Sequence, residues 1–349
     1  MRILHVTDRY SGGVGRAVDR ITELVPEAEH HLLSSGVEST DGRGAYAGTA
    51  ALPDGAAARV RAVRAAVGEL APDVVHAHSS WAGLYTRVLR LPVPVVYQPH
   101  CYWFERPDLP GPLRRAVRAA ERWLATHGSV VAAVSPHEER LARSLGARHV
   151  VRVPNAPSGA AVRRAGAGRA APRGTPAGAV RTVATTGRVV AQKDPDFLAR
   201  TARAARAAGA PLAFRWLGDG DPALVRRLTD AGVEVTGWLG ADEVVRELAA
   251  CDVYLHSAVY EGFPIAVLDA ARVGLPVVVR AIPAFEGSGL TAVATPQEAA
   301  AAVRSAAEDE LFRRRARVAG DHLVGEMDEA ALHDGVLRAY RTAAGALVA

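Results

Sequence analysis

The sequence predicts an α/β protein with two domains, each built on a parallel β-sheet covered by helices. Three observations support this prediction. The chain has 349 residues, more than one ordinary domain needs, and is 49% hydrophobic and 23% charged, as soluble globular proteins are. Short apolar runs alternate with helical patterns along the chain. This alternation is interrupted between residues 156 and 179 by a stretch rich in Gly, Pro, Ala and Arg.

Six apolar runs in the first half are interpreted as strands, at residues 3–6, 31–34, 74–78, 93–98, 130–135 and 150–154. Strands that are apolar on both faces are typical of a parallel sheet buried between helices. The helical patterns at 56–70 and 112–127 are long enough to be crossover connections. We therefore expect residues 1–157 to form a Rossmann-like domain.

The interruption, residues 158–181, is interpreted as a linker or exposed loop because it lacks apolar periodicity. Strands are then expected at 182–186, 213–217, 233–236, 253–256 and 276–280. These strands predict a second Rossmann-like domain over residues 182–326. The tail, residues 327–349, has a helical pattern, and we expect this helix to pack back on the first domain.

Composition excludes several classes of protein. The sequence contains no apolar stretch of about 20 residues, so no membrane span is expected. The apolar run after Met1 is too short for a secretory signal, which favours the cytoplasm, with the inner face of the membrane as a further possibility. Cys101 and Cys251 are too few for a disulfide framework or metal cluster. A net charge of +5 with only 5% aromatic residues does not favour nucleic acid as a partner.

Open parallel sheets bind ligands beyond the carboxyl ends of their strands, so polar residues that follow strands are the candidates for a site. Gly12, Gly13 and Gly15 form such a loop after the first strand, where exposed amides attract anions. The full dinucleotide fingerprint is absent, and a plain strand-to-helix turn is the alternative. Further candidates at strand ends are His78, His100, Arg188, Lys193, Gly218 and Glu261.

Arg188 and Lys193 follow the first strand of the second domain and place two cations within six positions. Lys193 is the single lysine of the chain, which disfavours a generic solvated surface. An ammonium acts as a point charge and a guanidinium as a bidentate clamp, and both suit a diphosphate. The alternative is a pair of exposed cations at a helix start.

The segment 260–269 runs from a strand into a helix whose first residue is expected to be Pro264. The amides and dipole of this helix start suit a phosphate. The carboxylates of Glu261 and Asp269 would repel a diphosphate, so we expect them to accept hydrogen bonds from neutral sugar hydroxyls. An ordinary helix-start acid and a surface Asp are the alternative.

Together these motifs resemble those of the retaining GT-B glycosyltransferases, in the large family that includes bacterial glycogen synthases and lipid mannosyltransferases. The resemblance covers nearly the whole length. The matching segments are the Gly-Gly-x-Gly loop, Pro72-Asp-Val-Val-His-Ala-His78, Val134-Ser135, Val153-Pro-Asn155, Gly187-Arg188 with Lys193, Leu217-Gly-Asp-Gly220 and the Glu261 motif.

The resemblance implies a role for each matching residue. Arg188 and Lys193 would hold the diphosphate, Glu261 and His100 would contact the donor sugar near the reacting centre, and Asp269 would contact the ribose, where the family pattern has Glu. The implied donor-binding set is Gly12, Gly13, Gly15, Gly187, Gly218, Trp238, Gly262, Phe263, Ile265, Ala266 and Asp269, and the acceptor-side set is His78, Tyr102 and Trp103. The implied co-substrate is a nucleotide diphosphate sugar, without a metal or other cofactor. The acceptor would be a glycan, a lipid-linked molecule or a small molecule.

Alternatives remain open at this stage. A sugar-nucleotide epimerase can share the two-domain architecture, and a weakly catalytic nucleotide-sugar-binding partner subunit would fit the Asp at position 269. An NAD-dependent oxidoreductase is disfavoured because the dinucleotide fingerprint is incomplete. The basic segment 112–126 has an apolar stripe and is interpreted as a crossover helix, with peripheral membrane contact as the second interpretation.

Overall fold

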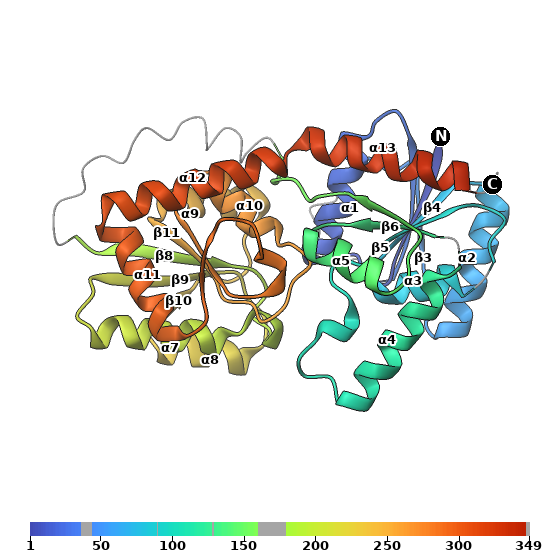
Figure 1. Cartoon of the computed structure of the whole chain (residues 1–349). Coiled ribbons are helices and arrows are strands. Elements are labelled where there is room, and N and C mark those ends of the chain that lie inside the picture. The colour runs from blue at the N-terminus through green and yellow to red at the C-terminus, as the bar shows by residue number, and fades with distance from the viewer. Residues whose placement is uncertain (36–43, 89, 128, 160–178, 347–349) are drawn as a thin grey trace. The chain divides into compact units, whose positions relative to one another are not determined.

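The computed structural model describes residues 1–35, 44–88, 90–127, 129–159 and 179–346. The chain divides into two compact units (Figure 1). Unit 1 comprises Met1–Ala156, Glu261–Phe263 and Asp328–Ala349, and unit 2 comprises Pro157–Tyr260 and Pro264–Met327. Most of the expected linker, residues 160–178, lies outside the described residues.

Unit 1 contains a parallel seven-stranded sheet in the order β3-β2-β1-β4-β5-β6-β7. Its strands are β1 (Arg2–Thr7), β2 (Glu29–Ser34), β3 (Gly48–Ala51), β4 (Val74–His78), β5 (Val95–Gln98), β6 (Val130–Ala133) and β7 (His149–Arg152). Its helices are α1 (Gly12–Leu24), α2 (Ala56–Leu70), α3 (Ser79–Arg87), η1 (Trp103–Glu105), α4 (Gly111–Ala125), α5 (Pro136–Ser144) and α13 (Glu329–Ala346).

The carboxy-terminal helix α13 covers one face of the unit 1 sheet together with α1 (Figure 1). Leu332, Val336 and Tyr340 of α13 are buried in one apolar cluster with Ile21 of α1. Gly335 allows the helix to lie close to the sheet, because a Cβ at this position would come within 2.7 Å of the carbonyl oxygen of Arg152. The opposite face of the sheet packs against α2, α3 and parts of α4 and α5.

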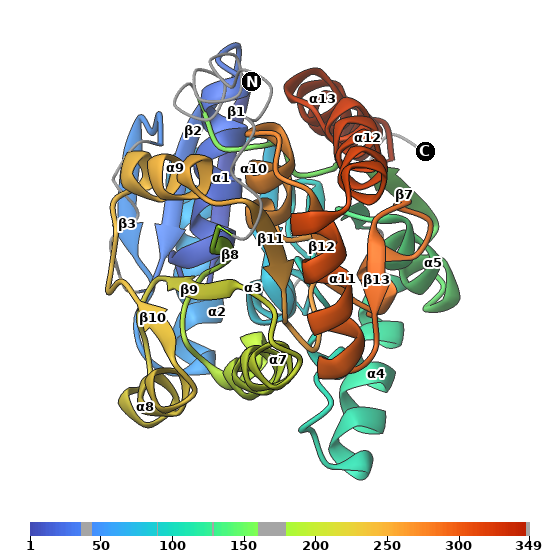
Figure 2. The same ribbon diagram turned by 90° about the vertical axis from the view of Figure 1, so that its left-hand side faces the viewer.

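Unit 2 contains a parallel six-stranded sheet in the order β10-β9-β8-β11-β12-β13. Its strands are β8 (Arg181–Thr186), β9 (Leu212–Leu217), β10 (Val233–Val235), β11 (Val253–His256), β12 (Val277–Arg280) and β13 (Thr291–Val293). Its helices are η2 (Ala191–Lys193), α7 (Pro195–Ala207), α8 (Pro222–Asp230), α9 (Ala241–Ala250), α10 (Ile265–Arg272), η3 (Pro283–Phe285), α11 (Pro296–Glu308) and α12 (Glu310–Glu326). Figure 2 shows these helices on both sides of the sheet.

Four helices begin with the same local signal, a polar capping residue followed by proline. The caps of α5, α7, α8 and α11 are Ser135, Asp194, Asp221 and Thr295, whose side chains accept hydrogen bonds from backbone amides of the first turn. Proline fits the next position because that amide has no partner in the helix. These signals fix where the crossover helices leave the carboxyl ends of the strands.

The prediction of two Rossmann-like parallel sheets is confirmed. In both sheets the chain first adds strands on one side of the first strand and then returns to add the rest on the other side. The strand order therefore reverses between β1 and β4 in unit 1 and between β8 and β11 in unit 2. The sequence did not predict β3 or β13. The strand expected at 93–98 begins two residues later, and that expected at 130–135 ends at Ala133. Among the described residues, no helix combines the length and apolarity needed to cross a bilayer.

Candidate functional site

Two glycine loops of unit 2 continue the pairing of β8 and β9 beyond the ends of these strands. The amide of Gly187 donates to the carbonyl of Leu217 at 3.0 Å, and the amide of Val189 donates to that of Asp219 at 2.7 Å. Gly218 has a φ of 143°, and a Cβ there would collide with the carbonyl oxygen of Gly187. Glycine at 218 is therefore required to bring the two loops together.

Lys193 lies against the first of these loops. A Cβ on Gly187 would be 3.4 Å from Cε of Lys193 and 3.9 Å from its Nζ. Lys193 and Arg188 are both half-buried. The structure thus brings the two cations that the sequence nominates to the carboxyl end of β8, next to a glycine that leaves the backbone accessible.

The backbone around Lys193 is held by residues from two other strands. The carbonyl of Lys193 accepts a hydrogen bond from Ser257 Oγ at 2.6 Å. The next residue, Asp194, caps α7 by accepting from the amide of Phe197 at 3.0 Å and forms an ion pair with Arg280 at 2.5 Å. These contacts hold Lys193 on a rigid segment between β8 and α7.

Trp238 lies next to the loop that contains Gly218. The residue before it, Gly237, forms an isolated bridge with Gly218. The side chain of Trp238 is 68% exposed. An exposed indole beside a glycine loop offers a flat apolar face to a planar ligand.

The segment around Glu261 is divided between the two units, because Glu261–Phe263 belongs to unit 1 and Pro264–Met327 belongs to unit 2. Gly262 packs on the turn after β5. A Cβ on Gly262 would lie 2.7 Å from the carbonyl carbon of His100 and 2.8 Å from the amide nitrogen of Cys101. This packing places Glu261 beside the turn that carries His100.

The turn formed by His100 and Cys101 has an unusual backbone. Both residues have positive φ, 54° and 103°, and such values are costly for residues with a Cβ. The buried carboxylate of Glu138 supports the turn by accepting from the amide of Cys101 at 2.5 Å and from that of Val134 at 2.9 Å. Burial raises the pKa of Glu138 to about 7, although the two backbone hydrogen bonds lower it in part.

The helix after Glu261 starts one residue later than expected. Helix α10 is Ile265–Arg272, and Pro264 is the residue that precedes it, with an extended ψ of 126°. No side chain caps α10. The sequence prediction of Pro264 as the first helical residue is therefore wrong, although the helix still presents its amide end near Ile265 and Ala266.

Asp269 is buried in unit 2, with 2% of its surface exposed. Its Oδ1 accepts from the amide of Ser158 at 2.6 Å and its Oδ2 from the hydroxyl of Ser158 at 2.8 Å. The carboxylate therefore fixes the backbone just after residue 157. The sequence predicts a donor contact for Asp269 with a surface position as the alternative, and the surface position is wrong because the residue is buried.

The first glycine loop forms the start of α1. Gly12 has a φ of 57°, and a Cβ on Gly13 would meet no atom within 4 Å. Gly15 is buried, and its amide donates to the carbonyl of Ser11 at 3.3 Å. The hydroxyl of Ser11 is buried and makes no hydrogen bond within the described part of the chain. This loop can accept an anion at the helix amino terminus.

The three acceptor-side candidates differ in their accessibility. His78 and Tyr102 are fully buried, and the ring of Tyr102 packs against Phe104 in the core. Trp103 is half-buried, with its ring centroid 5.2 Å from that of Trp81, which is 41% exposed. Of the three candidates only Trp103, together with the neighbouring Trp81, is accessible to a ligand.

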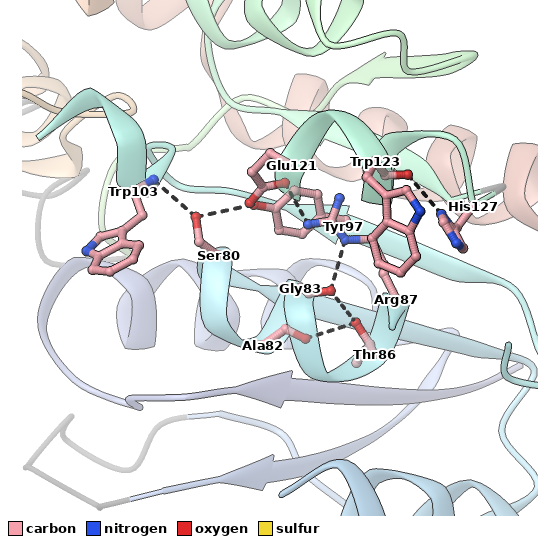
Figure 3. A network of polar contacts seen from close by, with 10 residues as sticks. All are labelled: Ser80, Ala82, Gly83, Thr86, Arg87, Tyr97, Trp103, Glu121, Trp123 and His127. Atoms are coloured by element: carbon pink, nitrogen blue, oxygen red, sulfur yellow. Dashed lines mark hydrogen bonds and ion pairs between the residues drawn. The ribbon is translucent and has the colours of Figure 1, made fainter. Parts of the chain in front are cut away.

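A buried polar network holds the segment that carries Trp103 (Figure 3). The amide of Trp103 donates to Ser80 Oγ at 3.1 Å, which lies 3.4 Å from the hydroxyl of Tyr97. That hydroxyl donates to Glu121 at 2.9 Å, and Arg87 forms an ion pair with Glu121 at 2.7 Å. The network joins η1 to α3, β5 and α4, so Trp103 is mounted on the core.

Helix α4 extends from the sheet of unit 1 (Figure 1) and exposes both apolar and basic side chains. Leu113 and Trp123 are 42% and 53% exposed. Arg115, Arg118 and Arg122 are exposed on the same helix. The helix packs on unit 1 through Leu124 and the buried Glu121. Its exposed surface therefore carries both apolar and basic side chains.

Three buried histidines lie on the adjacent strands β1 and β4. The possible ligand nitrogens of His5, His76 and His78 all lie within 4.8 Å of one another. Burial lowers the pKa of all three, which keeps the imidazoles neutral. Neutral imidazoles could hold a transition metal, and no motif in the sequence predicts this group of histidines.

Three residues that contact site candidates or their chain neighbours within their own unit, Glu138 in unit 1 and Ser158 and Arg280 in unit 2, stand in no motif that the sequence predicts to be functional. Ser135 followed three positions later by Glu138 is the capping-box pattern, which marks the start of a helix. Here that helix starts shortly after β6, so the pattern could have drawn attention to Glu138. Arg280 ends a predicted strand, at the edge where ligands bind. Ser158 carries no such signal.

Known protein families match both units. Residues 6–156 match the Glycosyl transferase 4-like domain, and residues 180–309 match the Glycosyl transferases group 1 domain. The chain belongs to the group 1 glycosyltransferases. The resemblance inferred from the motifs is thereby confirmed at the level of the family. No curated protein matches the sequence of this glycosyltransferase.

Solved structures similar to this glycosyltransferase extend over its whole length. HepE of Anabaena, in complex with UDP and glucose, has 17% identity and a TM-score of 0.74, over 98% of this chain and 100% of HepE. Sucrose-phosphate synthase of Thermosynechococcus elongatus has 15% identity and a TM-score of 0.74, over 98% of each chain. A glycosyltransferase of Rickettsia africae has 13% identity and a TM-score of 0.72, over 97% of each chain. These similarities confirm the GT-B fold.

Proposed function

We propose that this glycosyltransferase moves a hexose-type sugar from a nucleotide diphosphate sugar to an acceptor hydroxyl, with retention of the anomeric configuration. The observation that carries the proposal is the packing of Lys193 against Gly187, directly beside Arg188. The point charge of an ammonium and the fork of a guanidinium, next to accessible backbone, suit a diphosphate. The structure of HepE with UDP-glucose supports a donor of this class.

In the proposed reaction, the bond between the anomeric carbon and the diphosphate oxygen breaks, and the acceptor oxygen bonds to the same face of that carbon. The proton of the acceptor hydroxyl passes to the departing phosphate. Arg188, Lys193 and the uncapped amides at the start of α10 stabilise the charge that develops on the leaving diphosphate. The proposal needs no protein nucleophile, because the leaving phosphate itself guides front-side attack.

The proposal also needs no divalent metal and no cofactor besides the donor. Arg188 and Lys193 supply the positive charge that a metal ion would otherwise bring to the diphosphate. Activity in the presence of a chelator is the expected result. A requirement for added metal would contradict this part of the proposal.

We propose the remaining donor contacts from the family resemblance. Gly187, Gly218 and Trp238 would meet the nucleoside, and the loop of Gly12, Gly13 and Gly15 would meet a phosphate. Glu261 and His100 would accept hydrogen bonds from sugar hydroxyls, with Gly262 and Phe263 fixing their backbone. We propose that Asp269 contacts the ribose in addition to binding Ser158.

On the acceptor side, the accessible pair of Trp81 and Trp103 favours an acceptor that contains a sugar ring, because indoles stack on the apolar faces of sugars. His78 and Tyr102 would support this surface without contacting the acceptor directly, since both are buried. A glycan, a lipid-linked glycan or a small glycoside would satisfy this requirement.

We also propose that α4 contacts an anionic membrane surface, which would place the enzyme at the cytoplasmic face of the membrane. The exposed Leu113 and Trp123 supply apolar insertion, and the exposed Arg115, Arg118 and Arg122 supply charge. This combination is typical of interfacial helices. It also suits a lipid-linked acceptor.

The activity is tested by incubating the purified chain with UDP-, GDP-, ADP- and dTDP-hexoses and a panel of glycoside acceptors. We expect one donor to yield free nucleotide together with a glycosylated acceptor whose new linkage keeps the donor's anomeric configuration. An isomerised donor without transfer would identify an epimerase instead. Inverted product would contradict the proposed retention.

A further inference from the structure

Four histidines of unit 1 form a continuous chain of hydrogen bonds. His30 Nε2 lies 2.9 Å from the carbonyl oxygen of Val25, and His30 Nδ1 lies 2.9 Å from His5 Nε2. His5 Nδ1 lies 3.0 Å from His78 Nε2, and His78 Nδ1 lies 3.1 Å from His100 Nε2. We call these four residues the histidine relay. It runs from β2 through β1 and β4 to the turn after β5.

The two ends of the relay differ in chemistry. The carbonyl of Val25 can only accept a hydrogen bond, so His30 must carry its proton on Nε2. A neutral His30 then has a bare Nδ1, which must accept from Nε2–H of His5. The same step repeats twice, so His78 donates to His5 and His100 donates to His78. Each link leaves one possible tautomer for the next ring.

The relay consists of neutral rings. Burial lowers the pKa of His5, His30 and His78, and burial lowers the pKa of His100 to about 4. At neutral pH each imidazole therefore has one N–H and one bare nitrogen, so each ring can donate one hydrogen bond and accept one. A chain of buried hydrogen bonds that all run one way is cooperative, which disfavours a single reversed ring.

We infer that the Val25 carbonyl fixes the tautomer of His100 through His30, His5 and His78, so that His100 presents a bare Nδ1 that accepts a hydrogen bond from a substrate hydroxyl. Among the described residues, no protein group is hydrogen-bonded to His100 Nδ1. His30, His5 and His78 are positioning residues. The tautomer itself follows from unit 1 alone, whereas its use toward a sugar hydroxyl rests on the proposed function.

The same rings offer a metal site, and the two arrangements exclude each other. Both ring nitrogens of His5 and of His78 take part in the relay, so a metal bound by either ring would replace one of its hydrogen bonds. His76 stands beside the relay, with Nδ1 3.0 Å from the hydroxyl of Tyr340 and Nε2 buried without a hydrogen-bond partner within the described residues. The unbroken sequence of three His–His bonds favours the relay.

The test is ¹⁵N NMR of the full chain labelled at histidine, which distinguishes the Nε2–H and Nδ1–H tautomers without any substrate. We expect His100, His78, His5 and His30 all to be Nε2–H tautomers at neutral pH. An Nδ1–H tautomer at His100 would overturn the inference. Stoichiometric zinc in the purified protein, or zinc-dependent loss of the His5 and His78 N–H signals, would overturn it in favour of a metal site.

Variants at the far end of the relay test transmission. His30→Leu removes the anchor, so we expect His100 to show both tautomers and the KM for the donor to rise about 3- to 10-fold with little change in kcat. His30→Asn places an acceptor oxygen where Nδ1 stands and should restore the single tautomer. His31→Leu, on the same strand with its side chain bound to Glu29, is the matched control.

The outcomes separate the inference from the proposed function. A wild-type His100 with a single Nε2–H tautomer that His30→Leu leaves unchanged would overturn transmission through the relay. The expected tautomers in a chain that transfers no sugar would leave the relay standing and refute the proposed function.

Discussion

Gly262 packs on the peptide that joins His100 to Cys101, and a Cβ at position 262 would stand 2.7 Å from the carbonyl carbon of His100. Two segments that are far apart in the sequence therefore meet through a position where only glycine fits. The contact holds Glu261 beside His100, and Glu138 supports the same turn by accepting a hydrogen bond from the amide of Cys101.

The first prediction concerns this contact. Gly262→Ala forces the His100–Cys101 peptide to move, so we expect the free energy of unfolding to fall by about 1–3 kcal/mol and transfer activity to fall at least about tenfold. Chemical denaturation and initial rates measure the two effects. Gly68→Ala in α2 is the control, since a Cβ there meets no atom within 4 Å. Equal behaviour of the two variants would show that the contact has no importance.

The second prediction concerns Asp269 and Ser158. Asp269→Ala leaves the partly buried amide of Ser158 without its acceptor, so we expect a loss of about 2–3 kcal/mol in unfolding free energy. Ser158→Ala removes only the hydroxyl bond at 2.8 Å and should cost about 1 kcal/mol. Urea denaturation of both variants checks the order. A smaller loss for Asp269→Ala than for Ser158→Ala would contradict the assigned contacts.

The third prediction concerns pH. His76 is neutral in the fold because burial lowers its pKa to about 3 from 6.5. Below pH 6.5 the unfolded chain binds a proton that the folded chain does not, so the stabilisation present above pH 6.5 is lost as the pH falls toward 3. This histidine should contribute a slope of about 1.4 kcal/mol per pH unit in that window.

The measurement is the free energy of unfolding between pH 6 and pH 4 for the wild type and for His76→Leu. The variant should show a slope that is smaller by about 1.4 kcal/mol per pH unit. Groups that titrate in both proteins cancel in the comparison. Parallel slopes would show that His76 titrates normally in the fold.

The fourth prediction concerns α4. Replacing Leu113 and Trp123 by serine removes the exposed apolar side chains, so we expect binding to anionic phosphatidylglycerol vesicles to fall at least about tenfold. Val318→Ser, which changes another exposed apolar residue, is the control. Sedimentation with vesicles measures both. Undiminished binding by the double variant would eliminate α4 as the membrane contact.

The sequence predicts the elements whose pattern is local. The helix expected at 56–70 and the strands expected at 74–78 and 253–256 have the same bounds in the structure. Strand β3 was missed because it is short and largely exposed, so it has no apolar pattern. Strand β13 has only three residues, and one of them is buried.

The candidate site was predicted where a motif stays within one strand end, as for Gly187, Arg188 and Lys193. Contacts between distant segments left no trace in the local pattern. Nothing in the sequence pairs Asp269 with Ser158, and the histidine relay depends on strand order, since His5 and His30 lie on adjacent strands only once β1 pairs with β2. Sequence periodicity cannot supply such a register.

The central claim is that Lys193 helps to bind the diphosphate of a nucleotide donor. The most direct test measures the binding of UDP, GDP, ADP and dTDP to the wild type, Lys193→Ala and Arg200→Ala by thermal shift and calorimetry. Arg200 is an exposed cation on α7 and serves as the matched charge control. We expect one nucleotide diphosphate to stabilise the wild type and the Arg200 variant, with binding at least about tenfold weaker for Lys193→Ala. No stabilisation of the wild type by any of the four, or equal binding by all three proteins, would contradict the account.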